Sequence, residues 1–381
     1  MSLLASVPVR QCTATVRAAS RGGAARLPAF FVPPRVVLRR HTPAHSPLAA
    51  LRGPERKVAA RALSYMSDVD SLKLDTLCSR IPSPLVSVQW LKDHLTTPGV
   101  VVLEANWHLP TTGKGAADDF MGDRIPGAQF FDVDLVADTS SGLPHMLPAP
   151  EVFGRAMDAL GVTRDTLVVV YDRSGIFSAP RLWWMLRAFG HERVKVLEGG
   201  FPAWAAAKGA VDAEPLSREG ALGALAAAVE ADADAPLPRY AATLDMARLR
   251  TIDDVLRIIE DKSETIVDAR SASRFQGSSP EPRPGLRSGH MPGARNVPFD
   301  SCLSYGGAIR NSDELVRLFA SEHVDIKKPV TVTCGSGMTA CVVALALETL
   351  GAPQVAVYDG SWAEYGGRAD VPVSPVKGAS A

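Results

Sequence analysis

Short apolar runs alternate with longer segments of helical period along most of this 381-residue chain. Continuous apolar runs, typical of strands buried on both faces of a parallel sheet, occupy residues 100–106, 167–172 and 265–270. Apolar positions spaced as on one face of a helix occupy residues 151–161, 179–190 and 312–321. Strand and helix patterns that alternate in this way predict an α/β fold, with a parallel sheet and helices on both of its faces.

The whole pattern occurs twice. DRIPGAQFFDVD (123–134) corresponds to GHMPGARNVPFD (289–300), and each is followed by a strand, a turn, a helix and a strand that ends at a glycine. The separation is 166 residues for the glycines of the two P-G-A turns and 162 for Asp172 and Cys334. A nearly constant offset predicts a duplicated domain.

The repeat sets the expected domain boundaries. We expect a first domain at 83–212, a linker at 213–243 and a second domain at 244–370. The segment between the copies is rich in alanine and capped by prolines, which is typical of a linker that wraps one copy, part of it as a surface helix.

Residues 1–62 are typical of an organelle transit peptide. The first 54 residues contain eight arginines and no Asp or Glu, and they are rich in alanine and serine. Because arginine dominates, we expect import into the mitochondrion, with the plastid as second choice, and removal of the peptide near residues 55–66. A disordered basic tail that binds an acidic partner is the alternative.

Composition excludes several classes of function. The chain has 41 basic and 41 acidic residues, so no net field attracts nucleic acid or an anionic membrane. Apolar stretches reach only about ten residues, half of the roughly 20 that a membrane span needs. The five cysteines contain no C-x-x-C pair, which argues against zinc and against a disulfide framework and fits a reducing compartment.

Cys334 stands where a predicted strand passes into a predicted helix. The stretch VTVTCGSGMTACVVALALETLG (330–351) places a glycine-spaced turn directly after the cysteine. Backbone N–H groups of such a turn, at the positive end of a helix, form a nest for an anion, and a cysteine acts as a nucleophile through its thiolate. We therefore predict a functional Cys334 rather than a buried structural one, since the two glycines cost entropy unless the backbone needs that shape. Cys341 is expected to be a packed core residue.

The equivalent turn of the first repeat begins with Asp172 and contains no thiol. The sequence therefore predicts one active centre, in the second repeat, with the first repeat as a non-catalytic partner that lends residues to the cleft.

The duplicated x-x-P-G-A turn, the CGSGMT loop and the YDGSW closing strand resemble the two-domain rhodanese family over roughly residues 83–370. The resemblance implies two tandem rhodanese-like domains, each a parallel five-stranded sheet flanked by helices. Gly335 and Ser336 are similar to the loop of 3-mercaptopyruvate sulfurtransferases, particularly the organellar plant type, whereas thiosulfate-preferring members have Arg and Lys there. Met338 departs from the family pattern, in which valine is usual.

The resemblance also implies roles for individual residues. Arg274 and Arg283 match the arginines of the family segment R-F-x-G-x-x-P-E-P-R, which bind the substrate's carboxylate and keto groups. A guanidinium fork suits a carboxylate. The loop positions that would surround the substrate and the persulfide are Gly335, Gly337, Met338 and Thr339. Ser336, His145 and Asp134 match a relay that is proposed in the family to move protons.

The implied chemistry begins with attack of Cys334 on the sulfur of 3-mercaptopyruvate. Pyruvate is released, and the resulting persulfide passes its outer sulfur to a thiol, to reduced thioredoxin or to cyanide. Thiosulfate is implied as a secondary donor. The resemblance implies no metal or organic cofactor, no nucleic-acid or membrane partner, and a monomer.

Three alternatives remain at this point. The main activity could be that of a thiosulfate:cyanide sulfurtransferase, or the chain could be a non-catalytic persulfide carrier. A Cys-x5-Arg phosphatase is strongly disfavoured, because Ala340 stands where that motif requires arginine.

Overall fold

The computed structural model describes residues 74–109, 112–232 and 235–374. These residues lie within one compact unit of the chain, residues 61–381. The expected transit peptide, residues 1–62, lies outside the described residues.

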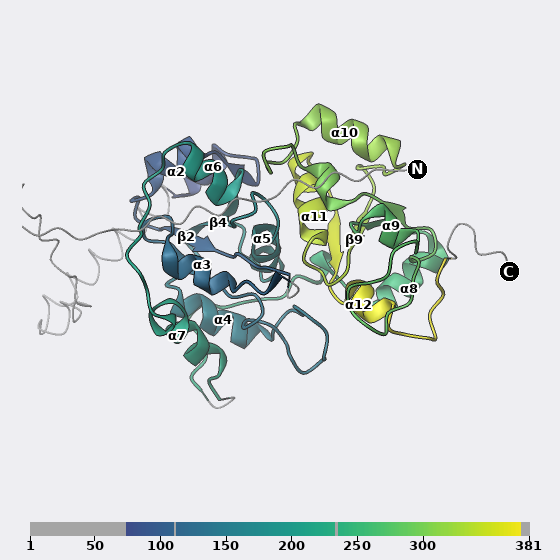
Figure 1. Cartoon of the computed structure of the whole chain (residues 1–381), viewed down its shortest axis with the longest axis horizontal. Helices are drawn as coiled ribbons and strands as arrows, with labels where there is room; N and C mark the ends of the chain where they lie inside the picture. Colours follow the sequence, from purple (N-terminus) through teal and green to yellow (C-terminus); the bar gives the residue numbers. More distant parts are fainter. Residues whose placement is uncertain (1–73, 110–111, 233–234, 375–381) are drawn as a thin grey trace, which may run out of the picture. The chain divides into compact units, whose positions relative to one another are not determined.

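The first repeat is built on a parallel five-stranded sheet with the order β1-β5-β4-β2-β3. Its strands are β1 (Leu85–Val86), β2 (Val100–Glu104), β3 (Gln129–Phe130), β4 (Leu167–Tyr171) and β5 (Val194–Leu197). Its helices are α2 (Val88–His94), α3 (Ala116–Gly122), α4 (Pro150–Ala159), α5 (Ala179–Ala188) and α6 (Gly200–Ala206). Figure 1 shows β2 and β4 between α2 and α6 on one side and α3 and α4 on the other. Every residue of β4 is buried, as its unbroken apolar run predicts.

The second repeat has a sheet of the same kind, with the order β6-β10-β9-β7-β8. Its strands are β6 (Leu249–Arg250), β7 (Thr265–Asp268), β8 (Arg295–Asn296), β9 (Val330–Thr333) and β10 (Val355–Tyr358). Its helices are α8 (Ile252–Asp261), α9 (Ala272–Phe275), α10 (Ser312–Ser321), α11 (Ala340–Thr349) and α12 (Ser361–Tyr365), with 3-10 turns η3 (Met246–Arg248) and η4 (Phe299–Cys302). The two sheets agree strand for strand, which confirms the predicted duplication and fold class.

Helix α7 (Arg218–Val229) occupies part of the segment between the repeats. It begins after Ser217, whose hydroxyl accepts a hydrogen bond from the N–H of Gly220, as in a serine N-cap. The helix packs on α3 and α4, and Arg155 of α4 donates to the carbonyl of Ala228. The segment therefore adds a covering helix to the first repeat.

One hydrophobic core continues from the first repeat into the second, where α5 packs against α11. Both helices are buried over almost their whole length. The sequence of α11, ACVVALALET, is apolar on nearly all sides, as expected for a helix that is covered all round.

The carboxyl ends of β7 and β9 meet at the centre of the second sheet. These strands are neighbours, but the chain leaves β7 toward β8 at one edge and leaves β9 toward β10 on the other side. Such a reversal opens a crevice at the strand ends, where parallel α/β sheets bind ligands. The segments that follow β7 and β9 carry Arg274 and Cys334.

Candidate functional site

Cys334 directly follows β9, and only 2% of its surface is exposed. Its backbone N–H donates to the hydroxyl of Ser361 at 3.3 Å, and its carbonyl accepts from the N–H of Trp362 at 3.0 Å. The turn after β10 therefore holds the backbone of the cysteine in place at the start of the loop that leads into α11.

The counterpart of this loop in the first repeat holds an anion. The buried carboxylate of Asp172 accepts four backbone hydrogen bonds at 2.8–2.9 Å, from the N–H groups of Ser174, Phe177, Ser178 and Ala179. The carbonyl of Asp172 also accepts from Phe201, just as that of Cys334 accepts from Trp362. The turn from Asp172 to the start of α5 is one residue longer than the turn from Cys334 to the start of α11. This arrangement indicates that the repeat's strand-to-helix turn stabilises a negative group at its first residue.

Two glycines of the Cys334 loop (residues 334–339) are favoured for different reasons. Gly337 has φ of 76°, in the left-handed region that favours glycine, and a Cβ there would lie 2.9 Å from Nη1 of Arg181. At Gly335 a Cβ would lie 2.9 Å from Nη2 of Arg274. Gly335 therefore leaves room for an arginine side chain beside the cysteine.

The two arginines expected to bind substrate have different surroundings. Arg274 of α9 forms an ion pair with Glu281, Nη2 to Oε2 at 2.5 Å, and Glu281 is also paired with the buried Arg270. Arg283 has no ion-pair partner among the residues that the structure describes. Burial lowers the pKa of Arg283, and the nearby charge of Cys334 opposes that shift. Arg283 is thus a cation near Cys334 that no ion pair among the described residues neutralises.

Two members of the expected relay come together in the first repeat. Nδ1 of His145 lies 2.7 Å from Oδ1 of Asp134, an ion-pair approach in which the ring N–H is poorly directed for a hydrogen bond. Burial alone would raise the pKa of Asp134, but the contact with His145, a hydrogen bond from Trp107 and the charge of Arg283 together lower it below its ordinary value. Asp134 is therefore the anion of this pair at neutral pH.

Ser336, the third member, is 6% exposed and lies two residues after Cys334. No hydrogen bond joins it to His145 within the described part of the chain. Both ring nitrogens of His145 are buried without a hydrogen bond, and the residue has φ of 62°. The structure therefore brings Asp134 and His145 together, but among the described residues no hydrogen bond extends this pair to Ser336.

Arg181 and Asp359 were missed by sequence reasoning. They form a fully buried ion pair, Nη1 to Oδ1 at 2.6 Å, that joins α5 of the first repeat to the turn after β10. Arg181 also donates to the carbonyls of Gly337 and His145, and the second oxygen of Asp359 accepts from the N–H of Leu147. The pair connects the Cys334 loop with the segment that carries His145. An arginine inside the otherwise apolar start of α5, APRLWW, was the available signal.

The remaining loop residues belong mainly to the protein interior. Met338 is 2% exposed and packs within the hydrophobic core, and Thr339 is the residue before the first turn of α11. Cys341 is fully buried, and its Sγ donates to the carbonyl of Gly337 at 3.2 Å. Burial raises the pKa of Cys341 to about 12. It therefore remains a neutral thiol at physiological pH, as the prediction of a packed core residue requires.

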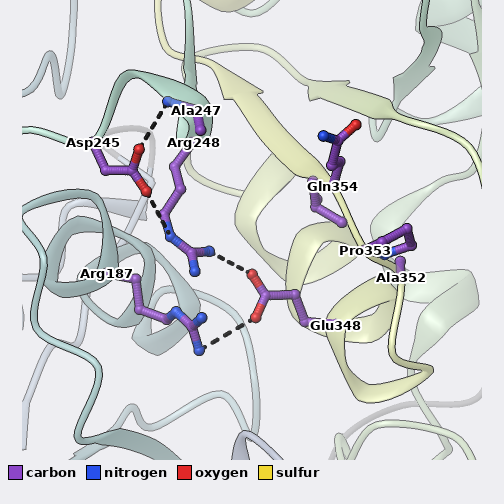
Figure 2. A pocket seen from close by; sticks show the side chains of 9 residues that line it. Arg187, Asp245, Ala247, Arg248, Glu348, Ala352, Pro353 and Gln354 are labelled. Atoms are coloured by element: carbon purple, nitrogen blue, oxygen red, sulfur yellow. Dashed lines mark hydrogen bonds and ion pairs between the residues drawn. The ribbon is translucent and has the colours of Figure 1, made fainter.

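A separate cavity of about 220 Å³ lies near the carboxyl ends of α5 and α11. Figure 2 shows Arg187 and Arg248 both reaching the carboxylate of Glu348, with Asp245 on the other side of Arg248. Since α11 has ten residues, roughly 15 Å of helix separates this cavity from the Cys334 loop. The charges that line it pair with one another, so we assign it to the contact between the repeats and not to the reaction.

No group of three or more His, Cys, Asp or Glu among the described residues could hold a metal ion. Within the same residues, no helix combines the length and apolar character that a membrane crossing requires.

Comparison with known proteins gives consistent results. Residues 87–207 and 251–367 match the family of the rhodanese-like domain. The 3-mercaptopyruvate sulfurtransferase of Escherichia coli K12 is 42% identical over 77% of this chain and 98% of its own. "Thiosulfate/3-mercaptopyruvate sulfurtransferase 1, mitochondrial" of Arabidopsis thaliana is 39% identical, over 78% of this chain and 79% of its own. The crystal structure of SseA from E. coli superposes with a TM-score of 0.63 at 37% identity, covering 74% of this chain and 99% of SseA.

Proposed function

Because this chain belongs to the rhodanese family of sulfur-transferring enzymes, we propose that it takes sulfur from 3-mercaptopyruvate onto Cys334 and releases pyruvate. The observation that carries this proposal is the position of Cys334 at the head of a turn whose counterpart stabilises the carboxylate of Asp172 with four N–H groups. A persulfide anion on Cys334 needs the same kind of support.

The location of positive charge around Cys334 indicates which sulfur donor the site suits. Thiosulfate is a dianion and suits cationic residues within the loop, but Gly335 and Ser336 are neutral. The positive charge instead belongs to Arg274, whose guanidinium lies against Gly335, and to Arg283, which has no ion-pair partner among the described residues. Two guanidinium groups beside the sulfur site suit a carboxylate attached to the reacting group. This arrangement favours 3-mercaptopyruvate as the main donor.

In the proposed reaction, the thiolate of Cys334 attacks the sulfur atom of 3-mercaptopyruvate. An S–S bond forms and the C–S bond breaks, with its electron pair passing to carbon as the enolate of pyruvate. The proton that left the substrate's thiol ends on that carbon, so no external oxidant or reductant is required. The Asp134–His145 pair, together with Ser336 of the loop, would move this proton from the thiol of the substrate to the carbon of the enolate.

The outer sulfur then passes to an acceptor nucleophile, for which we propose a thiol, reduced thioredoxin or cyanide. The protein's covalent carrier is the cysteine persulfide, and the proposed reaction uses no metal or organic cofactor. A chain that acts alone, as a monomer, suffices because both repeats contribute to one site. The basic segment 1–62 and the mitochondrial relative from Arabidopsis support import into the mitochondrion, with the plastid as second choice.

Substitution of Cys334 by serine tests the proposal. The variant should form neither pyruvate nor persulfide from 3-mercaptopyruvate, because serine cannot accept the sulfur. Pyruvate release at the wild-type rate would refute it.

The name of the Arabidopsis relative also includes thiosulfate, which supports a second donor. Comparison of kcat/KM for the two donors decides which one is the main substrate, and we expect the larger value for 3-mercaptopyruvate. If neither donor loads Cys334 but Cys334 accepts sulfur from a low-molecular-weight persulfide, the chain is instead a non-catalytic carrier.

A further inference from the structure

Trp107 lies three residues after β2, at the carboxyl end of the first sheet, and is 7% exposed. Its Nε1 donates to Oδ2 of Asp134 at 2.9 Å. The other oxygen of the same carboxylate lies 2.7 Å from Nδ1 of His145. Both oxygens of Asp134 are therefore engaged, one by each ring, although 59% of its side chain is exposed.

The indole also contacts the histidine directly. The rings of Trp107 and His145 are 5.0 Å apart between centroids, with an interplanar angle of 88°. This edge-to-face geometry is a favoured one for ring pairs. Trp107 thus touches both members of the pair, as a hydrogen-bond donor to the carboxylate and as a packing surface for the imidazole.

The indole is itself held from its other side. Phe177 stacks on Trp107 at 6.3 Å, and Phe299 of the second repeat meets Phe177 at 5.6 Å. The backbone N–H of Phe177 is one of the four donors to the carboxylate of Asp172. The turn that begins at Asp172 therefore holds Phe177 against Trp107, next to the Asp134–His145 pair.

We propose that Trp107 is a positioning residue that fixes the carboxylate of Asp134 toward His145 during sulfur transfer. The proposal rests on the proposed role of the Asp134–His145 pair. The last torsion of an aspartate side chain is soft, and water competes for an exposed carboxylate. A donor on the second oxygen restricts that rotation and keeps the first oxygen against the imidazole, which stabilises the position of the ring beside the carboxylate.

The test compares Trp107→Phe with a matched control. Phenylalanine keeps an aromatic ring but removes the N–H. The control is Trp183→Phe, because Trp183 is 1% exposed and its Nε1 has no hydrogen-bond partner among the described residues. We expect Trp107→Phe to lower kcat for 3-mercaptopyruvate about tenfold with little change in KM, in line with loss of a hydrogen bond to a charged group. The control should change neither constant by more than about twofold.

A double-mutant cycle separates positioning from general packing. In an Asp134→Asn background, Trp107→Phe should cause little further loss of kcat, because its effect passes through the carboxylate. An equal loss in both backgrounds would overturn the proposal. If Trp107→Phe does not fold, replacement of Trp107 by benzothienylalanine keeps the ring size while sulfur replaces the N–H, and the same loss is expected.

The outcomes distinguish this inference from the function on which it rests. If Trp107→Phe is fully active while Asp134→Asn is impaired, Trp107 has no positioning role, but the proposed role of the Asp134–His145 pair stands. Full activity of Asp134→Asn removes both the relay and the role of Trp107, but leaves sulfur transfer at Cys334 in place. Pyruvate release by Cys334→Ser would instead remove the proposed function itself.

Discussion

Arg274 and Arg283 come from one short motif, yet the structure gives them different tasks. Arg274 is tied to Glu281, so part of its charge is already compensated, and its guanidinium lies against Gly335. Arg283 is half-buried and has no ion-pair partner among the described residues. At the residue scale, then, the positive charge available to a substrate lies mainly on Arg283, and its loss should weaken binding more than it slows the reaction.

We predict that Arg283→Ala raises KM for 3-mercaptopyruvate about 10- to 100-fold, the range expected when a hydrogen-bonded charge partner is removed. Arg283→Lys should recover part of the loss, because it restores the charge without the fork geometry. Steady-state kinetics of both variants measure this. An unchanged KM in Arg283→Ala would show that this arginine does not bind the carboxylate of the substrate.

Cys302 and Cys341 are buried, as Cys334 is, but they lie outside the loop that begins at Cys334. Burial raises the pKa of both Cys302 and Cys341 to about 12, so each remains a neutral thiol until far above physiological pH. Since only thiolates alkylate rapidly, we predict that iodoacetamide at pH 7–9 modifies Cys334 first among these three. Peptide mapping after brief treatment measures the order. Faster modification of Cys341 than of Cys334 would contradict it.

At the scale of single elements, the same kind of strand-to-helix turn occurs in both repeats with a different first residue. After β4 it holds the carboxylate of Asp172, and after β9 it presents Cys334. The positions of the strands and long helices were predictable, because apolar runs and helical periods record burial on both faces. The geometry of the turns was only partly predictable. Gly337 could be predicted from the need for an unusual backbone angle, whereas the need for Gly335 depends on Arg274, which lies about 60 residues away along the chain.

We predict that Asp172→Ala destabilises the protein by about 3 kcal/mol, because four backbone N–H groups, those of Ser178 and Ala179 buried, lose their acceptor. Asp172→Asn should cost less, since the amide oxygen still accepts. Denaturant unfolding of both variants measures the difference. Equal stability of Asp172→Ala and the wild type would show that the anion is not needed in this turn.

At the scale of the whole molecule, the site is completed across the two repeats. In the proposed site, the second repeat supplies Cys334, Arg274 and Arg283, and the first supplies Asp134 and His145. The duplication was predictable from the constant offset, whereas the division of roles between the repeats, expected from the missing thiol at Asp172, stays a prediction. The Arg181–Asp359 pair was not, because a buried ion pair between distant segments leaves only an isolated charge in an apolar pattern.

We predict that Arg181→Met costs about 3–5 kcal/mol of stability, because it leaves Asp359 buried without its partner. The double variant Arg181→Met/Asp359→Leu should recover part of this loss, since no uncompensated charge remains. Both variants should stay slow in sulfur transfer, because the carbonyls of Gly337 and His145 lose their common donor. Unfolding curves together with kcat measure this. A double variant less stable than Arg181→Met would contradict the expectation.

The central claim is that Cys334 carries the transferred sulfur, and mass spectrometry of the protein after reaction with 3-mercaptopyruvate tests it most directly. We predict that the peptide containing Cys334 gains the mass of one sulfur atom and that one pyruvate is released for each sulfur gained. Pyruvate release without added sulfur on Cys334, or sulfur on another cysteine while Cys334 stays unmodified, would contradict the account.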